Sequence, residues 1–108
     1  MALSIQKESS NGTTVLKIHG ILDISTAFIL EQFIQELENV RELIIDFSNL
    51  EFIDSTGVGV IIEFIYLSQE KNFTIRFQGI DEQTYEIFET IGLFKVLEAF
   101  QDGHSNVS

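Results

Sequence analysis

The position that could carry chemistry in this chain is Ser55, which follows the strand-like run Phe52–Ile53 and precedes a predicted helix. Thr56, Gly57 and Gly59 are small, so the backbone at the start of that helix should be accessible. A helix N-terminus presents unpaired N–H groups and a partial positive charge, which favour an anion such as phosphate. Ser55 is therefore expected to be an exposed hydroxyl that tolerates phosphorylation. Serine is also a common N-cap residue, a role that needs no regulation, so both interpretations stay open from spacing alone.

Two patterns around Ser55 imitate known sites without completing them. Gly57-Val-Gly59 contains G-x-G but lacks the third glycine of a dinucleotide-binding loop. Asp54-Ser55-Thr56-Gly57 resembles the Asp-Ser/Thr-Gly of aspartic proteases, but one extra residue intervenes and the chain has no second copy. Neither pattern supports an enzyme.

The other reactive residue types do not form a catalytic or metal-binding set. His19 lies inside a predicted strand and His104 in the C-terminal tail, so neither is placed for a Ser–His–Asp device. The chain has no cysteine, and its acidic residues are scattered without ligand-like spacing. We expect no catalytic residue, no metal site and no cofactor. The ten phenylalanines are expected to be packing residues rather than a nucleobase-stacking surface.

The elements that must position Ser55 alternate along the chain. Strands are predicted at residues 3–8, 13–19, 43–47, 73–77 and 96–100, with an Asn-Gly hairpin turn between the first two. Helices are predicted at residues 27–37, 58–69 and 81–91, the first capped by Ser25 or Thr26 and the last ended by Gly92. This order favours parallel crossovers. We predict an α/β fold: one mixed sheet with an N-terminal hairpin and helices packed against the sheet.

Length and charge limit the organisation and the partners. The 108 residues fit a single domain, assigned to residues 1–101, followed by a polar tail at 102–108 that we expect to be disordered. With 17 acidic and 6 basic residues, the formal net charge is -11. That charge argues against nucleic acid and anionic membranes and favours a basic partner surface. No secretory signal or membrane-spanning run is visible, so we expect a soluble cytoplasmic protein.

Four motifs follow one another along nearly the whole chain, from about Leu3 to Phe100. They are Gly20-Ile-Leu-Asp23-Ile-Ser-Thr26-Ala27, Leu43-Ile-Ile-Asp46-Phe-Ser48, Phe52-Ile-Asp54-Ser55-Thr56-Gly57-Val58-Gly59 and Thr90-Ile-Gly92-Leu93-Phe94-Lys95-Val96. Together they resemble the STAS domain, and more narrowly the bacterial anti-sigma factor antagonists. The ordered set is far more specific than Asp-Ser-Thr-Gly alone.

The resemblance implies that Ser55 is phosphorylated by a partner that is both a serine kinase and an anti-sigma factor. The unphosphorylated form would bind that partner and free the sigma factor, and a phosphatase would reset the phosphorylated form. The chain would itself be no enzyme, ATP and Mg²⁺ would belong to the kinase, and a monomer or weak dimer is expected. The residues carried over as partner contacts are Asp23, Asp54, Thr56, Gly57, Val58 and Gly59.

Some alternatives remain open at the level of sequence. Asp23 could instead cap the helix that follows it. The whole chain could be a STAS scaffold subunit of a stress-sensing or lipid-transport complex, or a binder of nucleotides or other small molecules at the helix start. No Lys or Arg occurs between Arg41 and Lys71, so a phosphate on Ser55 would find no nearby base in the sequence. We therefore expect phosphorylation to exclude a partner by charge and size and to leave the fold almost unchanged.

Overall fold

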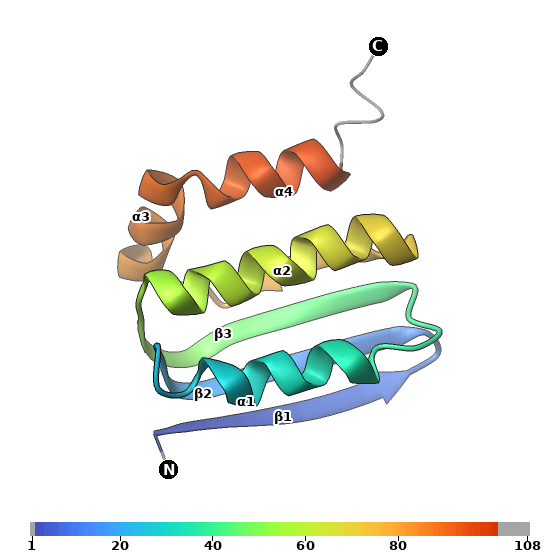
Figure 1. Ribbon diagram of the computed structural model, residues 1–108, viewed down its shortest axis with the longest axis horizontal. Helices are drawn as coiled ribbons and strands as arrows, with labels where there is room; N and C mark the ends of the chain where they lie inside the picture. Colours follow the sequence, from blue (N-terminus) through green and yellow to red (C-terminus); the bar gives the residue numbers. More distant parts are fainter. Residues whose placement is uncertain (1, 102–108) are drawn as a thin grey trace.

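Four strands form one mixed sheet, in the order β1-β2-β3-β4, in the computed structural model, which describes residues 2–101 (Figure 1). β1 (Leu3–Ser10) and β2 (Thr13–Leu22) are antiparallel, β3 (Glu42–Ile53) runs parallel to β2, and β4 (Thr74–Gln78) runs parallel to β3. The helices are α1 (Ala27–Glu31), continued by the 3₁₀ segment η1 (Gln32–Glu36), α2 (Ser55–Lys71), α3 (Glu82–Ile91) and α4 (Leu93–Gln101). The predicted α/β fold is confirmed. The predicted tail at 102–108, with His104, lies outside the described residues.

The turn between β1 and β2 has the backbone that a two-residue hairpin requires. Asn11 and Gly12 both have positive φ, at 53° and 85°, and Ser10 pairs with Thr13 directly across the turn. Such turns match the twist of the strands they join. The predicted N-terminal hairpin is therefore confirmed.

Helices cover one face of the sheet and bury the core against it. Figure 1 shows α1, α2 and α4 running roughly along the strands, and α2 contacts both α1 and α4. Because strand side chains alternate between faces, every second residue is buried from Thr14 to Ile18 in β2 and from Leu43 to Phe47 in β3, before two register shifts between these strands. The largest buried contributors from the sheet and α2 are Leu3, Leu16, Ile18, Leu22, Leu43, Ile45, Ile61, Phe64 and Ile65.

The predicted helix at 27–37 forms, but its winding changes partway. Only Ala27–Glu31 is α-helical, and Gln32–Glu36 continues as η1. Ala27, Leu30 and Leu37 are buried as the apolar spacing indicated. The spacing reports which side of the segment faces the core, and both windings bury that side, so the sequence does not separate them.

The predicted final strand at 96–100 is wrong, because this segment is part of α4. Gly92, with φ of 88°, ends α3, and its carbonyl oxygen accepts a hydrogen bond from the Val96 N–H at 3.2 Å, which starts the next helix. Leu93, Val96 and Leu97 then recur at helical spacing, and α4 packs on α2. A short apolar run fits a strand or a buried helix equally well until its packing partner is known.

The two central strands are longer than predicted, and both end at the same edge of the sheet. β2 continues to Leu22 and β3 to Ile53, and these two residues are paired in the parallel register. The loops that follow them, beginning at Asp23 and Asp54, therefore leave the sheet side by side. Within residues 2–101 no helix combines the length and apolar character needed to cross a membrane.

Candidate functional site

The start of α2 exposes Ser55 and assigns the helix cap to another residue. Ser55 is the first residue of α2 and its side chain is exposed. The N-cap is Asp54, whose carboxylate Oδ1 accepts a hydrogen bond from the Gly57 N–H at 2.9 Å. The interpretation of Ser55 as the N-cap is therefore wrong, because a carboxylate one residue earlier already satisfies that donor.

Asp54 also joins the loop after β2 to the start of α2. Its second carboxylate oxygen, Oδ2, accepts a hydrogen bond from the Ile24 N–H at 3.2 Å. The loop residue Asp23 precedes Ile24 directly, so the structure places Asp23 beside the Ser55 region. The two loops predicted from separate motifs meet at one edge of the sheet.

The carboxylate of Asp23 organises its own loop. Its Oδ1 accepts hydrogen bonds from the Ser25 N–H at 2.9 Å, the Ser25 hydroxyl at 2.7 Å and the Thr26 hydroxyl at 3.3 Å. The hydrogen bonds from Ser25 and Thr26 lower the pKa of Asp23, the Ser25 side chain having the largest effect, although desolvation opposes them. Thr26 occupies the N-cap position of α1 without a side-chain capping bond, so the predicted cap by Ser25 or Thr26 is wrong. The Asp23 carboxylate remains charged and near the Ser55 region.

Gly57 and Val58 lie beneath the site, in the core. A Cβ on Gly57 would lie 2.6 Å from the Leu22 carbonyl oxygen and 2.8 Å from a carbon of Ile53, so α2 packs closely on the ends of both strands. Val58 is 1% exposed. Of the residues predicted to contact a partner, these two hold the helix start in place and present no side chain to a partner.

Thr56 and Gly59 lie nearer the surface. Thr56 is half-buried, whereas Gly59 is exposed, with no heavy atom within 4 Å of where its Cβ would lie. Nothing in the described chain therefore requires a glycine at position 59. Ser55 and Gly59, one helical turn apart, are thus both exposed at the start of α2.

Sequence reasoning missed three exposed apolar side chains at this end of the sheet. Ile24, in the loop after β2, is 77% exposed, and Phe28, in the first turn of α1, is 57% exposed. Phe52 is 54% exposed, but it precedes the buried Ile53 in β3 and therefore points to the opposite face of the sheet. Phe28 and Phe52 contradict the expectation that the phenylalanines are all packing residues, whereas Phe64 and Phe88 confirm it. The helical spacing could have indicated the exposure of Phe28, because it puts Ala27 and Leu30 on the buried side of α1 and leaves Phe28 off that side.

Three of the six basic residues lie at the end of the sheet opposite Ser55. Arg41, which donates to the carbonyl oxygen of Asn11 in the hairpin turn, precedes β3, and Arg76 pairs with Glu42, the first residue of β3. Lys71 is the last residue of α2. These bases lie at the end opposite Ser55, which is the start of α2. The Ser55 end instead presents the carboxylates of Asp23 and Asp54.

Comparison with known proteins agrees with this geometry. The STAS domain pattern matches residues 4–106. The anti-sigma F factor antagonist of Paenibacillus polymyxa is 25% identical over 105 residues, 94% of this chain and 90% of the relative. A solved anti-sigma factor antagonist from Mycobacterium paratuberculosis is 27% identical, with a TM-score of 0.69 over 86% of this chain and 80% of that chain.

Two solved forms of SpoIIAA share the fold. The phosphorylated form of this Bacillus cell fate determinant gives a TM-score of 0.66 at 21% identity, over 91% of this chain and 88% of that chain. The unphosphorylated form, an anti-sigma factor antagonist, gives 0.64 at 21% identity, over 80% and 82% of the two chains. With its ordered motifs, its mixed sheet and a family match over most of its length, the chain belongs to the STAS domain family.

Proposed function

We propose that this chain is an anti-sigma factor antagonist controlled by phosphorylation of Ser55. The unphosphorylated chain binds an anti-sigma factor that is also a serine kinase, and the sigma factor is released. The kinase transfers the γ-phosphoryl group of ATP to the Ser55 Oγ, which loses its proton, and ADP leaves. A phosphatase hydrolyses the phosphoester and restores binding. The chain is thus a substrate rather than an enzyme, and ATP and Mg²⁺ are held by the kinase.

The observation that carries this proposal is the exposed Ser55 hydroxyl on the first residue of α2, with the cap supplied by Asp54. A kinase can reach such a hydroxyl without removing a structural hydrogen bond of the helix start. Two likenesses support the proposal: the P. polymyxa relative is named an anti-sigma factor antagonist, and SpoIIAA occurs in phosphorylated and unphosphorylated forms.

The surroundings of Ser55 suit a partner surface that is apolar at its centre and basic at its edge. The exposed side chains of Ile24 and Phe28 supply apolar contact area. The carboxylates of Asp23 and Asp54 select for Lys or Arg on the partner. A glycine at position 59 lets a partner approach the backbone of α2 closely.

Phosphorylation switches this surface off by charge and size. A phosphate adds about -1.5 to -2 charges at neutral pH. On Ser55 it lies next to Asp54, while Arg41, Lys71 and Arg76 are held at the other end of the sheet. The added charge therefore acts on the partner, and the fold stays almost unchanged.

The proposal is tested by incubating the chain with its cognate kinase–anti-sigma factor and ATP. Phosphate is expected on the wild type and absent from Ser55→Ala, because the acceptor oxygen is gone. Ser4→Ala is the control, since Ser4 is an exposed serine on β1, away from α2. Phosphorylated chain should bind the kinase at least about tenfold more weakly, a loss of about 1.4 kcal/mol. Phosphate found only on other residues would refute the assignment of Ser55.

Two further measurements test switching by exclusion and the scaffold alternative. Amide NMR spectra of both forms should differ only near Ser55, and changes in distant strands would contradict switching by exclusion. Sedimentation of the purified chain should give a monomer or weak dimer. A large self-assembly, or co-purifying transporter subunits, would instead identify a STAS scaffold subunit.

A further inference from the structure

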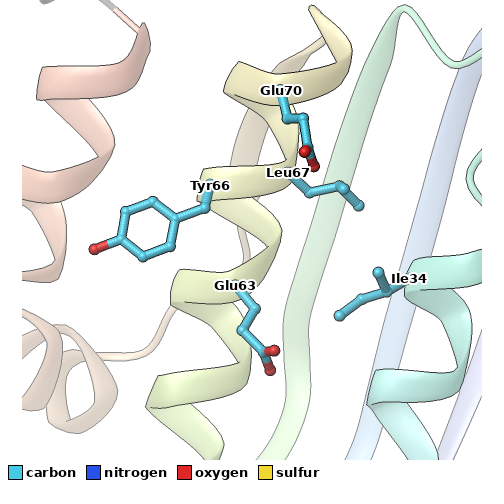
Figure 2. Close-up of a pocket in the computed structure, with 5 residues that line it drawn as sticks. All are labelled: Ile34, Glu63, Tyr66, Leu67 and Glu70. Atoms are coloured by element: carbon cyan, nitrogen blue, oxygen red, sulfur yellow. The ribbon is translucent and has the colours of Figure 1, made fainter.

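A second surface feature lies between η1 and α2, away from Ser55. It is a groove of about 440 Å³ lined by Ile34 of η1 and by Glu63, Tyr66, Leu67 and Glu70 of α2, here called the α1–α2 groove. In Figure 2, Ile34 and Leu67 point toward each other across the groove, while Tyr66 points away to the other side of α2. The groove therefore has an apolar floor made by one side chain from each element.

The wall of the groove formed by α2 carries negative charge at two positions along the helix. Figure 2 shows the carboxylates of Glu63 and Glu70 on the groove side of α2, one on either side of Leu67. Seven residues separate them, which is about two helical turns or about 10 Å along the helix. No Lys or Arg is among the residues lining this groove.

Glu63 also interacts with a carboxyl outside the groove lining, that of Glu31 at the end of α1. Burial together with this neighbour raises the pKa of Glu63. A cation bound at Glu63 would offset the repulsion between the two carboxylates. The groove is thus complementary to a positively charged ligand that also offers apolar surface.

The second groove with apolar lining lacks this complementarity. It lies along β4 and α4, beside Phe77, Phe94 and Leu97. Its charged lining residues are of both signs: Glu42, which pairs with Arg76 at 3.1 Å, and Glu98. Charge therefore distinguishes the α1–α2 groove, whose charged lining residues are both acidic.

We propose that the α1–α2 groove binds a basic amphipathic helix of a partner protein. Two Lys or Arg side chains seven residues apart meet Glu63 and Glu70. An apolar side chain between them packs on Ile34 and Leu67, as helices do when they lie in a groove. This contact requires neither Ser55 nor a phosphate, so it goes beyond the proposed function and survives if that function is refuted.

The test uses a synthetic amphipathic peptide of about 16 residues, long enough to become helical on binding. It carries two lysines seven residues apart with a leucine between them, and a second peptide replaces both lysines with glutamate. We expect the lysine peptide to shift the amide NMR signals of Ile34 and residues 63–70, and the glutamate peptide to leave them unchanged. The double variant Glu63→Gln/Glu70→Gln should bind the lysine peptide at least about fivefold more weakly than wild type. This loss should be larger at low salt than at high salt, because salt screens the charges that the variant removes.

The matched control is Glu82→Gln/Glu89→Gln, which removes two exposed carboxylates at the same spacing on α3. It should leave peptide binding within about twofold of wild type. Absence of binding, shifts confined to other surfaces, or an equal loss in the control pair would overturn the proposal. Self-association of the chain that Leu67→Asp abolishes would assign the groove to a second copy and would also overturn it. Thermal unfolding of each variant verifies that the fold is retained.

Discussion

At the scale of single residues, the two oxygens of one carboxylate connect the two halves of the candidate site. Asp54 accepts from the Gly57 N–H with one oxygen and from the Ile24 N–H with the other. The first bond starts α2 and leaves Ser55 free of capping. The second fixes the loop that carries the exposed Ile24. The position of the exposed Ile24 therefore depends on Asp54, the same side chain that caps α2 in place of Ser55.

Asp54→Ala should destabilise the fold and also weaken partner binding. Loss of an N-cap costs about 0.5–2 kcal/mol, and the Ile24 loop loses its anchor. Urea unfolding measures the first effect, and titration with the kinase–anti-sigma factor measures the second.

Asp81→Ala is the matched control, because Asp81 caps α3 through the Thr84 N–H at 2.8 Å. It should cost similar stability and leave partner binding unchanged. Equal loss of binding in both variants would show that Asp54 acts through stability alone.

Glu63 should make stability depend on pH. Burial and the carboxyl of Glu31 raise the pKa of Glu63 above its unfolded value, so the folded chain holds the proton more tightly. The stability this adds is fully present below the unfolded pKa, about 4.3, and is lost as pH rises through the raised folded pKa. Glu63→Gln should therefore stabilise the chain at pH 7 by about 0.5 kcal/mol or less, because the pair is largely exposed.

Urea unfolding of this variant at about pH 4 and about pH 7 tests the prediction. The stabilisation by Glu63→Gln should be larger at the higher pH. A gain from Glu63→Gln that is the same at both pH values would contradict the role of the Glu31–Glu63 pair.

At the scale of elements, the start of α2 is fixed by contact with the ends of two strands. Gly57 lies against the Leu22 carbonyl and Ile53, whereas Gly59, two residues later, has open space where a Cβ would be. Close packing thus requires glycine at position 57, whereas no contact within the described chain requires it at position 59.

This difference predicts opposite effects of the same substitution. Gly57→Ala should destabilise by about 1–3 kcal/mol, because a backbone carbonyl and a core side chain must move. Gly59→Ala should stabilise by up to about 1 kcal/mol, because alanine is the better helix former. Urea unfolding of both variants measures the two effects. Weaker kinase binding in the more stable Gly59→Ala would show that position 59 serves close approach of the partner, and unchanged binding would exclude that role.

The sequence was a good guide to elements with one clear periodicity and a poor guide where packing decides. The alternating β4 and the long apolar α2 were both located, since each pattern has one compatible structure. Residues 96–100 were assigned to a strand, because their apolar spacing becomes helical only once α2 provides the surface beneath. The spacing leaves open whether Ser55 caps α2, because the sequence offers Asp54 and Ser55 side by side and only the backbone geometry selects the carboxylate.

At the scale of the whole molecule, the net charge of -11 is spread over both ends of the sheet. Arg41 and Arg76 lie where β3 begins, but Arg76 is paired there with Glu42. Asp23 and Asp54 lie where β3 finishes, about 36 Å away. Within residues 2–101 neither Asp23 nor Asp54 forms a salt bridge, so both carboxylates are open to a basic partner.

Association with the kinase–anti-sigma factor should accordingly depend on salt. Raising the salt from about 0.1 M to about 1 M shortens the Debye length from about 10 Å to about 3 Å. The association rate should fall by about tenfold or more, measured by stopped-flow fluorescence. Arg41→Gln, at the far end, should leave this dependence unchanged. A rate insensitive to salt would contradict a basic partner surface.

The sequence by itself determined the fold class, the family and the position of Ser55 between a strand and a helix. Alternation, turn chemistry and ordered motifs are local, so they can be read along the chain. Only the tertiary structure decided that Asp54 accepts from the Ile24 N–H, that Val58 is buried while Ile24, Phe28 and Phe52 are exposed, and that Glu31 interacts with Glu63. Each of these depends on residues distant in the chain meeting in space, and burial and hydrogen bonding follow from that meeting.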